Sequence, residues 1–195
     1  MFLFSSGPTV QADATWFAAG LTSTFPETQD HAATLAQHRR CEALAAFKPG
    51  CKVFHVPRED PSLATEVDMT DTDFEAAEAS SELKDQVLVF QYRGKFHAVD
   101  HICPHSSYPL SQGTPFDIED FGVVLSSGLS CPKHGWSFDL FTGNADRATY
   151  KLTIWEVNLR APDEGTPPRN VQRGTAVPVA GEDMMVWVRK KQRIG

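Results

Sequence analysis

The sequence has no long apolar stretch and no early positive charge, and each absence excludes a class of protein. Nowhere in its 195 residues is there an apolar run of about 18, the length that a bilayer-spanning helix needs. No Lys or Arg precedes Arg39, so the first residues lack the basic region of a secretory signal and the Arg-rich character of a mitochondrial transit peptide. We therefore expect a cytoplasmic protein without a membrane partner.

Positive charge is also scarce overall, since the formal net charge is −7. A nucleic-acid-binding protein favours a basic surface, so we expect no nucleic-acid partner. The acidic residues crowd into positions 59–85, whereas residues 189–193 are basic. We interpret both as solvated segments. The alternative is that the acidic segment is a docking face for a redox partner, where attraction would raise the encounter rate.

Cysteine is too rare for a disulfide scaffold, because the chain has four. Two of them, Cys103 and Cys131, lie in the motifs described next. The other two, Cys41 and Cys51, are expected to be reduced and partly buried thiols, as is usual in a reducing compartment. A Cys41–Cys51 bridge stays open as an alternative.

Two short elements carry the chemistry: Cys103-Pro104-His105 and, after 25 intervening residues, Cys131-Pro132-Lys133-His134. Each supplies one thiolate and one imidazole, which suit zinc or iron. Two Cys with two His also form the ligand set of a [2Fe–2S] cluster in which imidazoles replace two thiolates. A structural zinc site is the alternative, although zinc usually takes closely spaced Cys pairs and His pairs. The nearby His101 is expected to be a surface or loop residue.

Two further motifs follow these elements, Pro-Leu-x-x-Gly at residues 109–113 and Phe-Asp-x-x-Thr-Gly at 138–143. With them the chain resembles the Rieske iron–sulfur family over residues 86–160, and more weakly out to about 51 and 192. The resemblance implies a [2Fe–2S] cluster with the buried iron on Cys103 and Cys131 and the outer iron on His105 and His134.

The hydrophobic pattern predicts a mainly β protein with a helix near its N-terminus. We expect the helix at about 28–47, and strands at 14–20, 51–57, 87–92, 95–100, 121–130, 152–159 and 184–191. The resemblance adds an antiparallel β-sandwich with a cluster-binding subdomain. The expected organisation is an N-terminal extension at 1–50 and a Rieske-type domain at 51–192. That domain would carry an acidic insertion at 58–85, with a possible short helix at 73–83, and a Pro/Gly-rich loop at 160–180.

The family's high-potential branch has an extra Cys in each ligand loop, where this chain has Tyr108 and Lys133. That branch also has Ser and Tyr hydroxyl donors where this chain has Trp136 and Phe138, which are expected to pack over the cluster. Fewer donors to the cluster sulfurs stabilise the reduced state less. We expect a potential near −150 mV, at the low end of the range for this ligand set, and a midpoint above about +150 mV would contradict this.

Machinery for substrate chemistry is not visible. No His follows His134, so the two-His-one-carboxylate iron site of an oxygenase has no candidate in the last 61 residues. Neither G-x-G-x-x-G nor a P-loop is present to bind a nucleotide or flavin. The resemblance therefore implies an oxidoreductase component, a Rieske-type ferredoxin that takes electrons from a flavin-dependent NAD(P)H reductase and passes them to an oxygenase or similar acceptor. Two alternatives are a non-catalytic subunit or regulatory domain of a larger redox enzyme, like the small subunits of some nitrite reductases, and an interaction module stabilised by a cluster or zinc.

Overall fold

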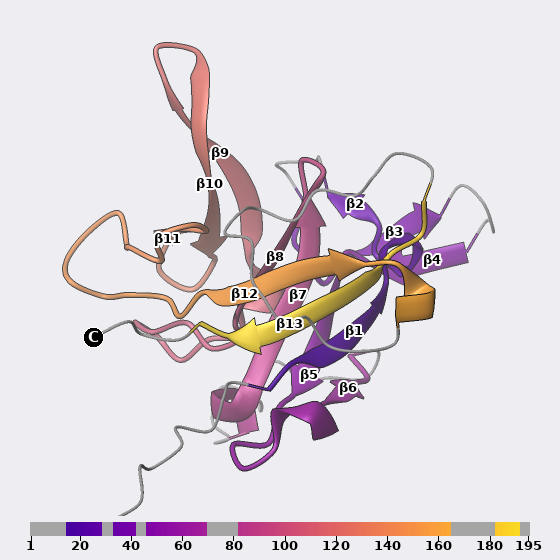
Figure 1. Ribbon diagram of the computed structural model, residues 1–195. Helices are drawn as coiled ribbons and strands as arrows, with labels where there is room; N and C mark the ends of the chain where they lie inside the picture. The colour runs from indigo at the N-terminus through magenta and orange to yellow at the C-terminus, as the bar shows by residue number, and fades with distance from the viewer. Residues whose placement is uncertain (1–14, 29–32, 42–45, 70–81, 165–181, 192–195) are drawn as a thin grey trace, which may run out of the picture.

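The computed structural model describes residues 15–28, 33–41, 46–69, 82–164 and 182–191, and these form strands and short 3₁₀ turns without an α-helix (Figure 1). The protein is mainly β, as the sequence predicts. Within the described part of the chain, no helix is long and apolar enough to cross a membrane.

The largest sheet has the strand order β2-β7-β5-β6, and the fifth strand, β8, also pairs with β7. Its strands are β2 (Glu27–Thr28), β5 (Cys51–His55), β6 (Thr65–Val67), β7 (Gln86–Tyr92) and β8 (Lys95–Asp100). All pairs are antiparallel except β2 with β7. The predicted strands at 51–57, 87–92 and 95–100 are confirmed. Part of the expected acidic insertion is strand β6, preceded by the 3₁₀ turn η2 (Pro61–Leu63).

Strand β7 explains how the core is divided, because its side chains alternate between two apolar layers. Val87 and Val89 face a layer shared with the second sheet, whereas Leu88 and Phe90 face the layer beside the third sheet. Both faces of β7 are therefore covered, and its apolar run is almost unbroken.

The second sheet has the order β1-β13-β12 and is antiparallel throughout. Its strands, β1 (Phe17–Leu21), β12 (Trp155–Arg160) and β13 (Met185–Lys190), lie side by side in Figure 1. Phe17 packs on Phe54 of β5 with ring centroids 5.4 Å apart, which joins the two sheets into a sandwich. The strands expected near 14–20, 152–159 and 184–191 are confirmed.

The third sheet, β11-β10-β9, carries the second ligand motif. It consists of β9 (Thr114–Asp120), β10 (Val123–Cys131) and β11 (Trp136–Asp139), all antiparallel. In Figure 1 the β9–β10 hairpin projects away from the body of the protein. Four large apolar side chains are exposed at its tip, those of Phe121, Val123, Val124 and Leu125, and Phe121 is 100% exposed.

The N-terminal helix predicted at 28–47 is wrong. The described residues there form a turn and two paired strands, β3 (His38–Cys41) and β4 (Ala46–Pro49). Just before β3, Leu35 and Ala36 donate their backbone N–H groups to the carbonyls of Gly113 and Ser111. Each residue has a single backbone N–H donor. When that donor bonds to a distant carbonyl, it cannot also make the local hydrogen bond of a helix.

Three remaining expectations concern parts of the chain that are only partly described. The possible helix at 73–83 lies outside the described residues except for its last two, which belong to the 3₁₀ turn η3 (Glu82–Asp85). The loop at 160–180 is described only as far as the 3₁₀ turn η5 (Pro162–Glu164). Cys51 is buried, and the side chain of Cys41 lies outside the described part of the chain, so the state of Cys41 stays a prediction.

Candidate metal centre

Two tight loops bring the sequence-predicted ligands together. The first follows β8 and closes on itself through Cys103, whose N–H donates to the Tyr108 carbonyl at 2.9 Å and whose carbonyl accepts from Ser107 at 2.9 Å. The second joins β10 to β11, with the Gly135 N–H donating to the Cys131 carbonyl at 3.0 Å. Each turn has a residue at positive φ, Ser107 at 57° and Gly135 at 68°. The ligand loops are therefore short, internally bonded structures at strand ends.

The two cysteines form a buried pair of thiols, each 1% exposed. The hydrogen bond to the Cys131 thiol lowers the pKa of Cys103 to about 5, with help from the Ser106 hydroxyl and the backbone N–H groups of Ser106 and His105. The same hydrogen bond between the two cysteine side chains, together with burial, raises the pKa of Cys131. One member of the pair is therefore a thiolate at neutral pH, the form that binds metal.

The two histidines form a second pair beside the first, with ring centroids 5.2 Å apart at an angle of 77°. Nδ1 of His105 is buried and has no hydrogen-bond partner. A buried polar atom without a partner is rare in a native protein, and a bound metal is one of its common explanations. The donor set and this orphaned nitrogen thus fit a metal group placed between the loops.

The pairing argues against a single ion as the occupant. Among the described residues, no group of three or more His, Cys, Asp or Glu side chains could hold one metal ion. A structural zinc ion requires about four such ligands. Two pairs of donors are also the ligand pattern of a [2Fe–2S] cluster with two Cys and two His ligands.

Backbone and hydroxyl donors point at the sulfurs of this site. The Lys133 N–H bonds to the Cys131 sulfur, and the Ser106 hydroxyl lies 3.6 Å from it. Sequence reasoning missed Ser106 as a donor, although a hydroxyl inside the first ligand loop was a visible signal. Lys133 places its Nζ 5.5 Å from the centre of the Tyr108 ring, so a cation–π contact joins the two loops at these positions.

Aromatic side chains cover one side of His105. The Trp136 ring stacks on the imidazole with centroids 4.1 Å apart at 18°, and Tyr150 meets it edge-on at 5.3 Å. Phe138 is completely buried in the core. Trp136 therefore packs on a proposed ligand and Phe138 on the core, and that either covers a cluster stays a prediction.

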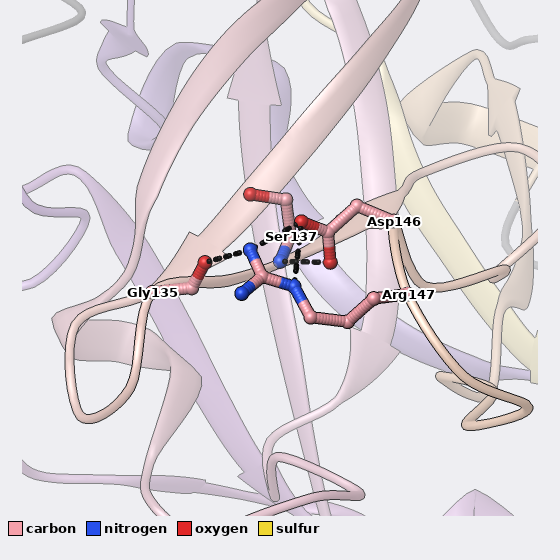
Figure 2. Close-up of polar contacts among 4 residues, drawn as sticks. All are labelled: Gly135, Ser137, Asp146 and Arg147. Carbon is pink, nitrogen blue, oxygen red and sulfur yellow. Dashed lines mark hydrogen bonds and ion pairs between the residues drawn. The ribbon is translucent and has the colours of Figure 1, made fainter.

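The segment that carries Tyr150 is fastened to β11 by polar contacts (Figure 2). Arg147 donates to the Gly135 carbonyl at 3.2 Å and pairs with Asp146 at 2.6 Å. Asp146 also accepts the Ser137 N–H at 3.2 Å, and the guanidinium beside it lowers the pKa of this carboxyl. The Arg147 guanidinium carbon lies 5.5 Å from the centre of the Trp136 ring. We call residues 146–150 the strap.

Gly143 lets the chain turn back toward the strap. Its φ is +76°, and a Cβ there would lie 2.1 Å from the Leu152 carbonyl oxygen. Both the conformation and the close approach require glycine. The Thr-Gly end of the second motif is thereby explained by backbone geometry.

The expectation that His101 is a surface or loop residue is half right: it lies in a bend just after β8, but it is only 3% exposed. Its Nδ1 lies 2.8 Å from the Gln86 side-chain oxygen and its Nε2 lies 2.9 Å from the Ser111 hydroxyl. Burial lowers its pKa to about 4, so the ring is neutral and accepts at Nε2 while donating at Nδ1. The signal was strand alternation, since His101 continues the face of Val99.

Comparison with known proteins agrees with this geometry. Residues 59–155 match the family model of the Rieske [2Fe-2S] domain. The chain is 36% identical over 58 residues to the ferredoxin component of the alkene monooxygenase system of Xanthobacter autotrophicus, covering 30% of this chain and 41% of the relative. It is 33% identical over 57 residues to the methanesulfonate monooxygenase ferredoxin subunit of Methylosulfonomonas methylovora, covering 29% and 40%.

Human apoptosis-inducing factor 3 is 39% identical over 62 residues, which are 31% of this chain and 9% of that protein. The chain thus spans less than half the length of each of these curated relatives. Among solved structures, a chain proposed to be an NADH-dependent nitrite reductase small subunit from Mycobacterium tuberculosis aligns with a TM-score of 0.47 and 12% identity, over 93% of this chain and 99% of that one.

Proposed function

The chain carries a Rieske [2Fe–2S] domain, and from this premise we propose that it is a ferredoxin-type carrier of single electrons. A Rieske domain holds a [2Fe–2S] cluster and transfers electrons. The observation that carries the proposal is the pairing of the four donors, buried thiols on one side and imidazoles on the other.

In this proposal Cys103 and Cys131 hold the inner iron, and His105 and His134 hold the outer iron. The cluster supplies one-electron chemistry, and its potential with this ligand set lies between about −150 and +300 mV. The chain supplies the rest: backbone N–H groups and the Ser106 hydroxyl donate to the sulfurs, and Nδ1 of His105 faces the site without a competing partner.

The proposed partners are a flavin-dependent NAD(P)H reductase as electron donor and an oxygenase or similar enzyme as acceptor. The names of two relatives support this choice, because they are ferredoxin components of monooxygenase systems.

The test is reduction of the purified protein by such a reductase with NAD(P)H, followed as bleaching of the visible absorbance. We expect a red-brown protein with a rhombic EPR signal after dithionite reduction. Cys103→Ser should lose the colour, and Cys51→Ser is the matched control, because Cys51 is equally buried but lies outside the proposed site. A colourless protein containing one zinc would contradict the proposal, as would a coloured Cys103→Ser variant.

A further inference from the structure

The two imidazoles of the centre differ in their exposure. His105 is half-buried, with Trp136 on one face and Tyr150 against its edge. His134 belongs to an exposed run, residues 132–135, and the described aromatic contacts of its ring are limited to His105. We propose that electrons enter and leave through His134, at a basic docking surface that fits an acidic face on the redox partner. This rests on the proposed function and identifies the kind of partner.

The cover over His105 is a fixed part of the structure. Three hydrogen bonds of 2.8 to 3.2 Å fasten the strap to Gly135 and Ser137, and the ion pair between Arg147 and Asp146 lies within the strap itself. Tyr150 and Trp136 also meet one another edge-on, with centroids 5.1 Å apart. A partner that approaches from the side of the strap therefore meets aromatic rings before it meets His105, whereas His134 is open.

Charge around His134 is opposite in sign to that of the chain as a whole. Lys133 precedes it, Arg147 contacts Gly135 just after it, and Lys151 follows the strap; all three are exposed. Asp146, the acidic residue of the strap, is paired with Arg147. Farther along β11, the Asp139 carboxylate accepts bonds from Ser126 and from the backbone of residues 141 and 142. We call Lys133, Arg147 and Lys151 the basic docking surface.

Basic groups around His134 are complementary in charge to an acidic face on the partner. Opposite charges at an interface guide the encounter, and like charges slow it. With a net charge of −7, the chain repels an acidic protein except where basic groups surround the point of electron exchange. The basic docking surface would attract an acidic partner while the rest of the chain repels it. The partner would therefore bind in the orientation that brings it to His134.

The test uses small charged oxidants on the purified, cluster-loaded protein, so no partner has to be identified. Stopped-flow oxidation of the dithionite-reduced protein by the anion ferricyanide and by the cation tris(phenanthroline)cobalt(III) gives two bimolecular rate constants. We expect the ferricyanide rate to fall with added salt, which indicates attraction despite the net negative charge. Lys133→Glu should slow ferricyanide about 10-fold at low salt and speed the cation.

Arg160→Glu is the matched control, because it makes the same change of charge at the end of β12 and should alter either rate less than two-fold. Voltammetry on each variant separates a change in driving force from a change in encounter. Equal slowing by Lys133→Glu and Arg160→Glu, or a ferricyanide rate that rises with salt in the wild-type protein, would overturn the docking surface. If these results hold but no reductase reduces the protein, the docking surface stands and the proposed ferredoxin role fails.

Discussion

His97 is the buried titratable residue that the proposed electron transfer does not use. It stacks on Phe90 with centroids 5.5 Å apart and meets Phe141 edge-on, while its Nε2 is buried without a partner. Burial lowers its pKa to about 4, and the nearby Lys95 acts in the same direction against the weaker opposite effect of Asp139. The ring is therefore held neutral in the core.

This residue predicts a loss of stability in mild acid. An unfolded histidine takes up a proton near pH 6.5, whereas His97 in the folded protein does so only near pH 4. The contribution of neutral His97 to the free energy of unfolding is therefore fully present above pH 6.5. As the pH falls toward 4, this contribution is lost, and the loss amounts to about 3 kcal/mol. His97→Phe should reduce the slope of the free energy of unfolding over that window, measured by urea titration at several pH values, while His101, whose pKa is also lowered to about 4, keeps its share of the slope. An unchanged slope in the variant would contradict the prediction.

At the same scale, the ligand residues were predictable and their surroundings were not. Cys103, His105, Cys131 and His134 stand in short motifs whose residue types reveal their chemistry. Tyr150 and Arg147 reach the site only because Gly143 turns the chain back on itself, and no local pattern encodes such a contact. His101 was expected at the surface or in a loop, and it does follow the end of β8, but it continues the inward face of Val99 and is therefore buried.

Among the elements, the two tightest hairpins have the same turn but different sequences. Arg93-Gly94 joins β7 to β8, and Phe121-Gly122 joins β9 to β10, with both residues of each turn at positive φ. That is the type I′ geometry, for which Asn-Gly is the preferred pair. At Phe121 (φ 48°) an L-residue with a bulky side chain is strained by roughly 1–2 kcal/mol.

Phe121→Asn should therefore stabilise the protein by about 1 kcal/mol, since asparagine tolerates this backbone region. No packing is lost, because the Phe121 side chain is fully exposed. Chemical denaturation followed by circular dichroism measures the change. Phe121→Ala is the control: it removes the ring but keeps the strained backbone, and it should give no such gain. Equal stabilisation by both substitutions would show that the aromatic ring, and not the turn, sets the effect.

Strand prediction succeeded and helix prediction failed for one physical reason. In the β7–β8 hairpin, the two apolar strands and their turn are consecutive in sequence. The signal for this hairpin is therefore local. In the segment around residues 33–41, the backbone is held by Gly113 and Ser111, more than 70 positions away. Helix-compatible spacing could not reveal partners at that separation, and long-range contacts override weak local preference.

At the scale of the whole molecule, the described residues form two apolar layers, and of these two the proposed cysteine ligands belong to one. Cys103 and Cys131 lie in the layer with Leu88, Phe90 and Phe138, whereas the layer between β1, β12, β13 and the main sheet has no ligand residue. Loss of the cluster should therefore loosen one side of the protein and leave the other folded.

Hydrogen exchange on cluster-loaded and cluster-free protein tests this division. We expect the amides of residues 101–108 and 131–136 to exchange at least about 10-fold faster without the cluster, while those of β12 and β13 keep their protection. A uniform increase across the molecule would instead show that the cluster supports the entire fold. Unchanged exchange in both ligand loops would mean that the loops are set by their own backbone bonds.

The projecting β9–β10 hairpin also gives the experimenter a fixed marker. Strand β10 runs without interruption from Val123 to Cys131, so the turn lies roughly 26 Å from the nearest proposed ligand at 3.3 Å per residue. Exposed turns accept insertions and labels with little effect on the fold. The magnetic coupling between a spin label attached at position 121 and the reduced cluster would give the distance between them, and so the position of the cluster relative to the hairpin.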